Sequence, residues 1–283
     1  MPQTESTATQ STLAAGAVEI LTTADPAAKA RRAHALAEAW RGGRIEPGTA
    51  EPPDRPARPA RPLLLAPREM PKRKAGPSLA GRIALLHALA HIELNAIDLA
   101  WDLIARFGSA ELPRAFFDDW VKVGDQEAAH FELLAARLAE VGAAYGDLPA
   151  HDGLWQAALE TRHDLLARLA IAPLVLEARG LDVTPAMIAS LRRHGDATSA
   201  AALEVIYREE IGHVAAGKRW FDWLARERGL EPAVAFQDLV QRHFRGKLKP
   251  PFNTTAREAA GMTAAFYAFP LPGFEAGEGG DAA

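Results

Sequence analysis

The chain has 283 residues, a formal net charge of −4 and no cysteine. The lack of cysteine excludes disulfides, zinc ribbons and iron–sulfur clusters, and the small negative charge argues against a generic nucleic-acid or membrane-surface binder. No apolar run reaches about 18 residues, and the N-terminus lacks the apolar core of a signal peptide. We therefore expect a cytoplasmic protein that does not bind a membrane.

An alanine- and leucine-rich composition with 48% hydrophobic residues favours an all-α fold. Residues 1–43 are predicted to form a small helical preface, in which Asp25 and Pro26 begin the second helix. Residues 44–77 are too rich in proline to be helical and are also basic. They form either a disordered linker or an extended strap over the helices, and three leucines at 63–65 favour a strap that these leucines pin.

A four-helix bundle is predicted in residues 78–230. Ser78 should cap its first helix, Pro173 should kink its third helix one turn before Glu177, and Thr184-Pro185 should begin a short separate helix. A C-terminal helical extension at 231–270 and a disordered tail at 271–283 follow. The four long helices are expected at 78–107, 112–142, 152–180 and 196–229.

One motif occurs twice. It is a lone glutamate followed by a Glu-x-x-His pair, 34 residues later in the first copy and 33 residues later in the second. Residues three apart on a helix lie about 60° apart around its axis, so each pair aims at one point. Apolar residues flank every position, which places these side chains on inward helix faces. Buried carboxylates need compensating cations. The set is Glu93, Glu127, His130, Glu177, Glu210 and His213.

Four carboxylates and two imidazoles in this order are the ligand set of a carboxylate-bridged di-metal centre. They suit iron or manganese better than zinc, which prefers nitrogen and sulfur ligands. We predict two iron ions, with manganese or a mixed Mn/Fe pair as alternatives, bridged by Glu127 and Glu210. Glu93 with His130 would complete one half-site, and Glu177 with His213 the other.

Other polar residues lie near the motif. Tyr207, one turn before Glu210, either hydrogen-bonds a ligand or passes an electron, or is a plain core tyrosine. Glu209 points about 100° from Glu210 and is interpreted as a surface residue. A third pair, Glu160/His163, is placed on the helix of Glu177 and interpreted as exposed. A polar stripe turned away from Glu93 is expected to be solvated or covered by the strap, with a second metal site as a lesser alternative: His87, His91, Asn95, Asp98 and Asp102.

Several segments together resemble the ferritin-like family known as domain of unknown function 455. They are HIELNAIDLAWD (91–102), DQEAAHF (125–131), LEARGLDVTP (176–185), YREEIGHV (207–214) and the proline-rich RPARPARPLLLAPREMPKR (55–73). The resemblance spans roughly residues 40–270. It implies a ferritin-like bundle with a di-iron centre at the six residues named above, all of which are present, and it supplies no substrate.

The leading hypothesis is an oxidoreductase that uses two ferrous ions to activate dioxygen and oxidise or hydroxylate a small-molecule substrate, with electrons from an external donor. The alternatives are a ferroxidase that handles iron and a helical interaction module that metal only stabilises. Basic residues near 55–74 and 242–249 leave RNA as a less favoured partner, and a dimer is plausible. The sequence leaves open the substrate, the metal, the electron donor and the oligomeric state.

Overall fold

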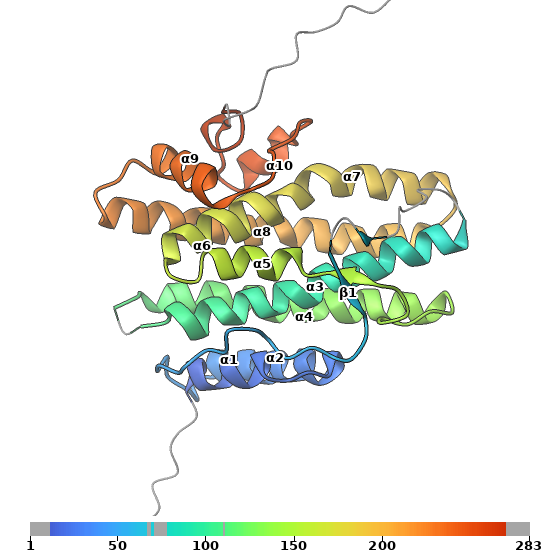
Figure 1. Cartoon of the computed structure of the whole chain (residues 1–283), viewed down its shortest axis with the longest axis horizontal. Helices are drawn as coiled ribbons and strands as arrows, with labels where there is room; N and C mark the ends of the chain where they lie inside the picture. Colours follow the sequence, from blue (N-terminus) through green and yellow to red (C-terminus); the bar gives the residue numbers. More distant parts are fainter. Residues whose placement is uncertain (1–11, 67–68, 71–77, 110, 270–283) are drawn as a thin grey trace, which may run out of the picture.

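The computed structural model describes residues 12–66, 69–70, 78–109 and 111–269, and these residues are mostly helical, as the composition predicts (Figure 1). The tail predicted at 271–283 and part of the proline-rich segment lie outside the described residues. Two short strands, β1 (Leu64–Leu65) and β2 (Ala150–His151), pair in parallel. The fold is therefore all-α apart from this small pairing.

Three long helices form the centre of the molecule: α3 (Leu79–Phe107), α4 (Arg114–Glu140) and α8 (Ala197–Glu227). α4 packs against both α3 and α8. Ser78 accepts a hydrogen bond from the Gly81 amide at 3.2 Å and so caps α3 as predicted. By length and composition α3 could cross a membrane, but 67% of its most apolar window is buried inside the protein, which fits the core helix of a soluble protein.

The third long helix, predicted at 152–180, is broken into shorter elements. They are α5 (Gly153–Glu160), α6 (Leu165–Ile171), the π-helical segment η2 (Ala172–Glu177) and α7 (Ala178–Arg193). The break after α5 occurs where the Thr161 hydroxyl donates to the Ala157 carbonyl at 3.0 Å and Asp164 caps α6. Such side chains compete for backbone groups and end helices. Glu160 and His163 are exposed, as predicted, but they lie at this break rather than on one helix with Glu177.

Pro185 lies inside α7, so the prediction that it begins a separate helix is wrong. Proline cannot donate to the carbonyl four residues before it, which here belongs to Leu181. That carbonyl instead accepts a hydrogen bond from Asn253 Nδ2 at 3.0 Å. The C-terminal extension thus replaces the missing helical bond. This extension contains α9 (Pro232–His243), α10 (Thr254–Ala259) and the 3₁₀ turn η3 (Ala264–Phe266).

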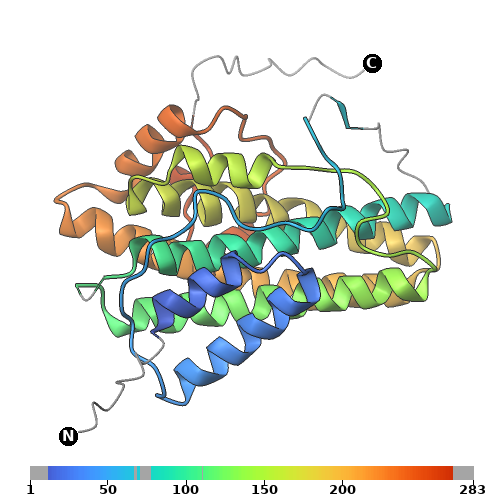
Figure 2. The same ribbon diagram turned by 60° about the horizontal axis from the view of Figure 1, so that its bottom comes forward.

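The N-terminal helices α1 (Leu13–Leu21) and α2 (Pro26–Arg41) pack against α3 and α4, and an extended strap then crosses α3 (Figure 2). Side-chain donors hold the strap by its carbonyls: Arg106 donates to Pro53 at 2.8 Å and the Trp155 indole to Asp54 at 3.2 Å. Leu63 and Leu64 are 66% and 41% exposed. The strap is therefore present, but hydrogen bonds to its backbone, and not the side chains of Leu63 and Leu64, hold it in place.

The polar stripe on α3 is buried rather than solvated, with all five side chains at most 5% exposed. Asp98 pairs with Lys29 of α2 and Arg58 of the strap, and Asp102 pairs with Arg106 and Arg168. Buried charges persist when they are paired in this way. Arg58 of the strap therefore pairs with a residue of the protein itself, and RNA stays the less favoured partner.

The buried pair of Lys29 and Asp98 gives a stability prediction. We expect Lys29→Met to lower the free energy of unfolding by about 2 kcal/mol, because the buried Asp98 loses its buried cation and keeps only the partly buried Arg58. Arg32→Met is the matched control on the same helix, because Arg32 pairs with Glu19 in solvent and such pairs contribute little. Urea unfolding of both variants tests this, and equal losses would contradict it.

Candidate metal centre

The structure brings the six predicted ligand residues to one place in the centre of the molecule. Candidate ligand atoms of Glu93, Glu127, His130 and Glu210 lie within 4.8 Å of one another. His213 joins them, with its Nδ1 2.9 Å from Glu127 Oε1. Glu177 interacts electrostatically with Glu210, Glu127 and His213 from the end of η2. Helices α3, α4, η2 and α8 therefore each contribute, as the spacing predicts.

Two of the carboxylates face both imidazoles. Glu127 lies 2.9 Å from Nδ1 of His213 and 3.4 Å from Nδ1 of His130. Glu210 Oε1 lies 3.3 Å from Nδ1 of His213 and 3.8 Å from Nδ1 of His130. Glu93, in contrast, lies 3.5 Å from Nδ1 of His130. Glu127 and Glu210 are therefore the two central carboxylates, and Glu93 lies beside His130, its partner in the predicted half-site.

The cluster is deeply buried and short of hydrogen bonds. Glu127 is 0% exposed, and His130 and His213 are each 1% exposed. Among the described residues, eleven buried side-chain atoms lack a hydrogen-bond partner, and five of them belong to this cluster: Glu127 Oε1 and Oε2, His130 Nδ1, Glu177 Oε2 and His213 Nδ1. Buried polar atoms normally have partners. Four of these atoms, on Glu127, His130 and His213, lie beside one another, and oxygen and nitrogen atoms grouped in this way without partners are those that a cation would satisfy.

The protonation states of the cluster follow from burial and charge. Burial raises the pKa of Glu93 and of Glu177 well above the ordinary carboxyl value. Burial opposes protonation of His130, but the adjacent carboxylates of Glu127 and Glu93 outweigh it and raise its pKa to about 12. Glu210 and Glu127 likewise raise the pKa of His213, against burial. Glu127 is also desolvated, yet the two imidazolium charges lower its pKa. Without metal, protons therefore neutralise the cluster.

Glu177 reaches the cluster from the π-helical segment, a local structure that the sequence analysis did not predict. Pro173 cannot donate a backbone hydrogen bond, and the chain widens into η2 instead of simply kinking. The Pro173 ring fits against Gly217 of α8, where an added Cβ would lie only 2.4 Å from Pro173 Cβ. The missing side chain at Gly217 thus allows η2 to approach α8 and place Glu177.

This close approach gives a prediction about Gly217. We expect Gly217→Ala to push η2 away from α8 and weaken metal binding by about tenfold, because small displacements of ligands or their supports have effects of this size. Gly180→Ala on α7 is the matched control, since an added Cβ there has no neighbour within 4 Å. Metal titration of both variants tests the prediction. Equal affinities would show that the contact does not position Glu177.

Two further side chains contact the outer nitrogens of the histidines. His130 Nε2 lies 2.8 Å from Glu209 Oε2, and His213 Nε2 lies 3.1 Å from Gln126 Oε1. The interpretation of Glu209 as a surface residue is therefore incomplete, because its side chain is 35% exposed but its carboxylate contacts a buried imidazole. A signal was present in the sequence: a Gln or Glu directly precedes the glutamate of both Glu-x-x-His pairs.

Comparison with known proteins places the chain in a family. The family described as "Protein of unknown function (DUF455)" matches residues 22–268. The chain belongs to this DUF455 family. An "Uncharacterized protein" of Haemophilus influenzae is 42% identical over 210 residues, which cover 72% of this chain and 73% of that protein. No solved structure matches the chain. The DUF455 match includes all six residues of the cluster.

Tyr207 of this DUF455 protein was predicted as a possible neighbour of the ligands. Its hydroxyl accepts a hydrogen bond from Asn253 Nδ2 at 2.8 Å, so it contacts the C-terminal extension. Its side chain is partly buried and packs against the core. A role for Tyr207 in electron transfer or in orienting a ligand stays a prediction.

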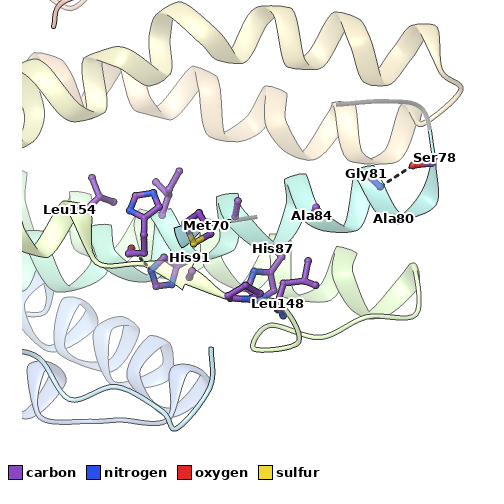
Figure 3. A pocket seen from close by; sticks show the side chains of 14 residues that line it. Met70, Ser78, Ala80, Gly81, Ala84, His87, His91, Leu148 and Leu154 are labelled. Atoms are coloured by element: carbon purple, nitrogen blue, oxygen red, sulfur yellow. Dashed lines mark hydrogen bonds between the residues drawn. The ribbon is translucent and has the colours of Figure 1, made fainter. Parts of the chain in front are cut away.

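A cavity of about 300 Å³ lies beside α3 and is lined by the side chains drawn in Figure 3. His87 and His91 line it from α3, and His91 is separated from Glu93 by about 200° around the helix axis. His91 Nδ1 is already 2.8 Å from the Tyr145 hydroxyl, and burial together with the Arg58 charge lowers the pKa of His91 to about 4. Within the described residues, no second cluster of three potential metal ligands occurs. The cavity is therefore separate from the candidate metal centre.

Proposed function

We propose that this DUF455 protein is a ferritin-like four-helix-bundle protein whose buried cluster binds two iron ions and activates dioxygen to oxidise or hydroxylate a small organic substrate. The observation that carries the proposal is the set of five buried atoms without hydrogen-bond partners on four ligand residues, of which Glu127, His130 and His213 are buried as whole side chains. Such atoms are costly to bury without a partner. Six oxygen- and nitrogen-donor side chains, without sulfur, suit iron or manganese.

The residues have distinct roles in this proposal. Glu127 and Glu210 would bridge the two ions, because each faces both imidazoles. Glu93 with His130, and Glu177 with His213, would each complete one half-site. When bound, the ferrous pair would supply two electrons to dioxygen. The surrounding helices exclude bulk water, since Glu93, Glu127, His130 and His213 are at most 5% exposed.

The side of the cluster at Glu210 is partly open. The side chain of Glu210 is 13% exposed and that of Glu209 35% exposed, in contrast to the buried Glu127. Small molecules would reach the cluster from this side. The chain has no cysteine that could donate electrons, so the reductant would be a separate protein or a small molecule.

Rapid mixing with oxygen tests the proposed reaction. The protein is loaded anaerobically with Fe(II) and mixed with oxygenated buffer, while visible absorption and oxygen consumption are followed. We expect a transient visible absorption band and oxygen uptake in proportion to the bound iron, and neither in Glu127→Ala. Bound iron that consumes no oxygen would refute the oxygen-activating function and leave a metal that only stabilises the helices.

A further inference from the structure

The two histidines of the cluster have chemically different partners at their outer nitrogens. Nε2 of His130 donates to the carboxylate of Glu209 at 2.8 Å, and Nε2 of His213 donates to the amide oxygen of Gln126 at 3.1 Å. Each partner belongs to the opposite helix, since Glu209 lies on α8 and Gln126 on α4. The two halves are therefore alike in geometry, but the acceptor is a carboxyl group in one and an amide in the other.

The partner of Nε2 affects the nitrogen on the other side of the ring. An oxygen acceptor at Nε2 holds the imidazole so that Nδ1 points at the carboxylates, as it does in both halves. A carboxylate acceptor makes a charge-assisted hydrogen bond that is roughly twice as strong as a neutral one. It also increases the basicity of the ring as a ligand. His130 should therefore be the stronger donor of the two.

We propose that Glu209 and Gln126 are positioning residues that make the two metal positions unequal, and that the position beside His130 binds its ion more tightly. This inference rests on the proposed metal centre and goes beyond it by assigning an order to the two positions. The two ions would then load in sequence, the first beside Glu93 and His130 and the second beside Glu177 and His213. A centre of this kind can hold two different metals.

Titration with Co²⁺ against a competing chelator tests the proposal. Wild-type protein should show two binding constants. Glu209→Gln should weaken the tighter binding constant by about tenfold, so that the two constants become similar. Side chains that hydrogen-bond to ligating histidines change metal affinity by about 10- to 100-fold. Gln126→Glu should tighten the weaker one. The control is Glu204→Gln on the same helix, because Glu204 pairs with Arg192 and is absent from the cluster.

A second readout separates positioning from a general effect on folding. In the Co²⁺-loaded protein, the Nε2 proton of each bound histidine gives its own shifted NMR signal. Glu209→Ala should make one of these protons exchange faster with water and leave the other unchanged, whereas a loosened fold would affect both. Glu209 is partly exposed, so its replacement leaves the core packing in place.

The outcomes distinguish this inference from the proposed function. Co²⁺ binding by the wild-type protein with unchanged constants in Glu209→Gln and Gln126→Glu would overturn the unequal positions but keep the metal centre. Two equal constants in the wild-type protein would also overturn them. No Co²⁺ binding in the wild-type protein would refute the metal centre itself.

Discussion

Replacing Glu127 by glutamine is expected to lower the affinity for Fe(II) by more than about 100-fold. Removing a side chain that hydrogen-bonds to a metal ligand already lowers metal affinity by about 10- to 100-fold. Glu127 is itself a predicted ligand, and its carboxylate lies 2.9 and 3.4 Å from the two imidazoles. The substitution keeps the shape of the side chain and removes its charge. Anaerobic titration against a chelator, with circular dichroism to verify folding, measures the change.

The chain provides a matched control for this substitution. Glu160 belongs to the third Glu-x-x-His pair, but it is exposed and lies at the break after α5. Glu160→Gln removes the same charge from the same sequence pattern and should bind Fe(II) as the wild-type protein does. A similar loss in both variants would mean that net charge, not the buried cluster, determines iron binding.

The second large effect is a strong dependence of metal binding on pH. Without metal, His130 and His213 carry protons, and burial also favours the protonated forms of Glu93 and Glu177. Metal ligands must lose these protons. Two imidazolium and two carboxyl groups could release up to about four protons, and each released proton changes the binding constant by about tenfold per pH unit. Binding should therefore strengthen steeply as pH rises.

The metal-free protein should show the opposite trend. The pKa of His130, His213, Glu93 and Glu177 is raised in the folded state. A group whose pKa is raised on folding stabilises the folded protein fully at a pH below its pKa in the unfolded chain, which is about 4.5 for the carboxyls and about 6.5 for the imidazoles. This stabilisation is lost as the pH rises through the pKa of the group in the folded protein. Glu127, whose pKa is lowered, contributes above about pH 4.5 and loses this contribution in acid.

Thermal unfolding measures both trends in one experiment. Between about pH 5.5 and 8.5, the Tm of the metal-free protein should fall and the increase in Tm produced by Fe(II) should grow. Proton release into a weakly buffered indicator solution during titration gives the stoichiometry directly. A metal-induced increase in Tm that does not depend on pH, with no proton release, would show that the ion binds elsewhere.

The six cluster residues could be predicted from the sequence because buried charge at helical spacing has few explanations. The interpretation of Glu209 as a surface residue is incomplete for a physical reason. Helix geometry gives only the direction of its side chain relative to its own helix, about 100° from Glu210, whereas its contact lies on the neighbouring α4. Contacts between helices depend on how they pack, so the Gln or Glu that precedes each Glu-x-x-His pair does not by itself show which side chain it contacts. Gln126 was missed for the same reason.

The backbone of the third helix also depended on tertiary contacts. Both prolines are predicted to interrupt a helix, but Pro173 lies in the π-helical segment η2 and Pro185 lies inside the continuous helix α7. At Pro173 the space above Gly217 allows a π-helical segment, and at Pro185 the Asn253 amide replaces the missing helical hydrogen bond. Both partners are far away in the sequence. Local propensity therefore marks the positions where a helical hydrogen bond is missing, but it does not determine whether the helix continues through them.

The way in which the strap is held also depends on contacts between residues that are far apart in the sequence. Its three leucines predicted an apolar anchor, yet Leu63 is 66% exposed and the segment is held by donors to its carbonyls and by Arg58 on the buried Asp98. For the polar stripe that includes Asp98, the sequence left two alternatives: contact with solvent or cover by the strap. The pairing of Asp98 with Lys29 and Arg58 shows that the strap covers it, and burial of a carboxylate requires such cations.

Anomalous diffraction from crystals of iron-loaded protein, with data collected on both sides of the iron absorption edge, tests the metal centre most directly. We predict two iron peaks inside the cluster, each close to Nδ1 of one histidine and both in contact with Glu127 and Glu210. No peak in the cluster of protein that has been loaded with iron, or iron only at surface carboxylates, would contradict the di-metal centre.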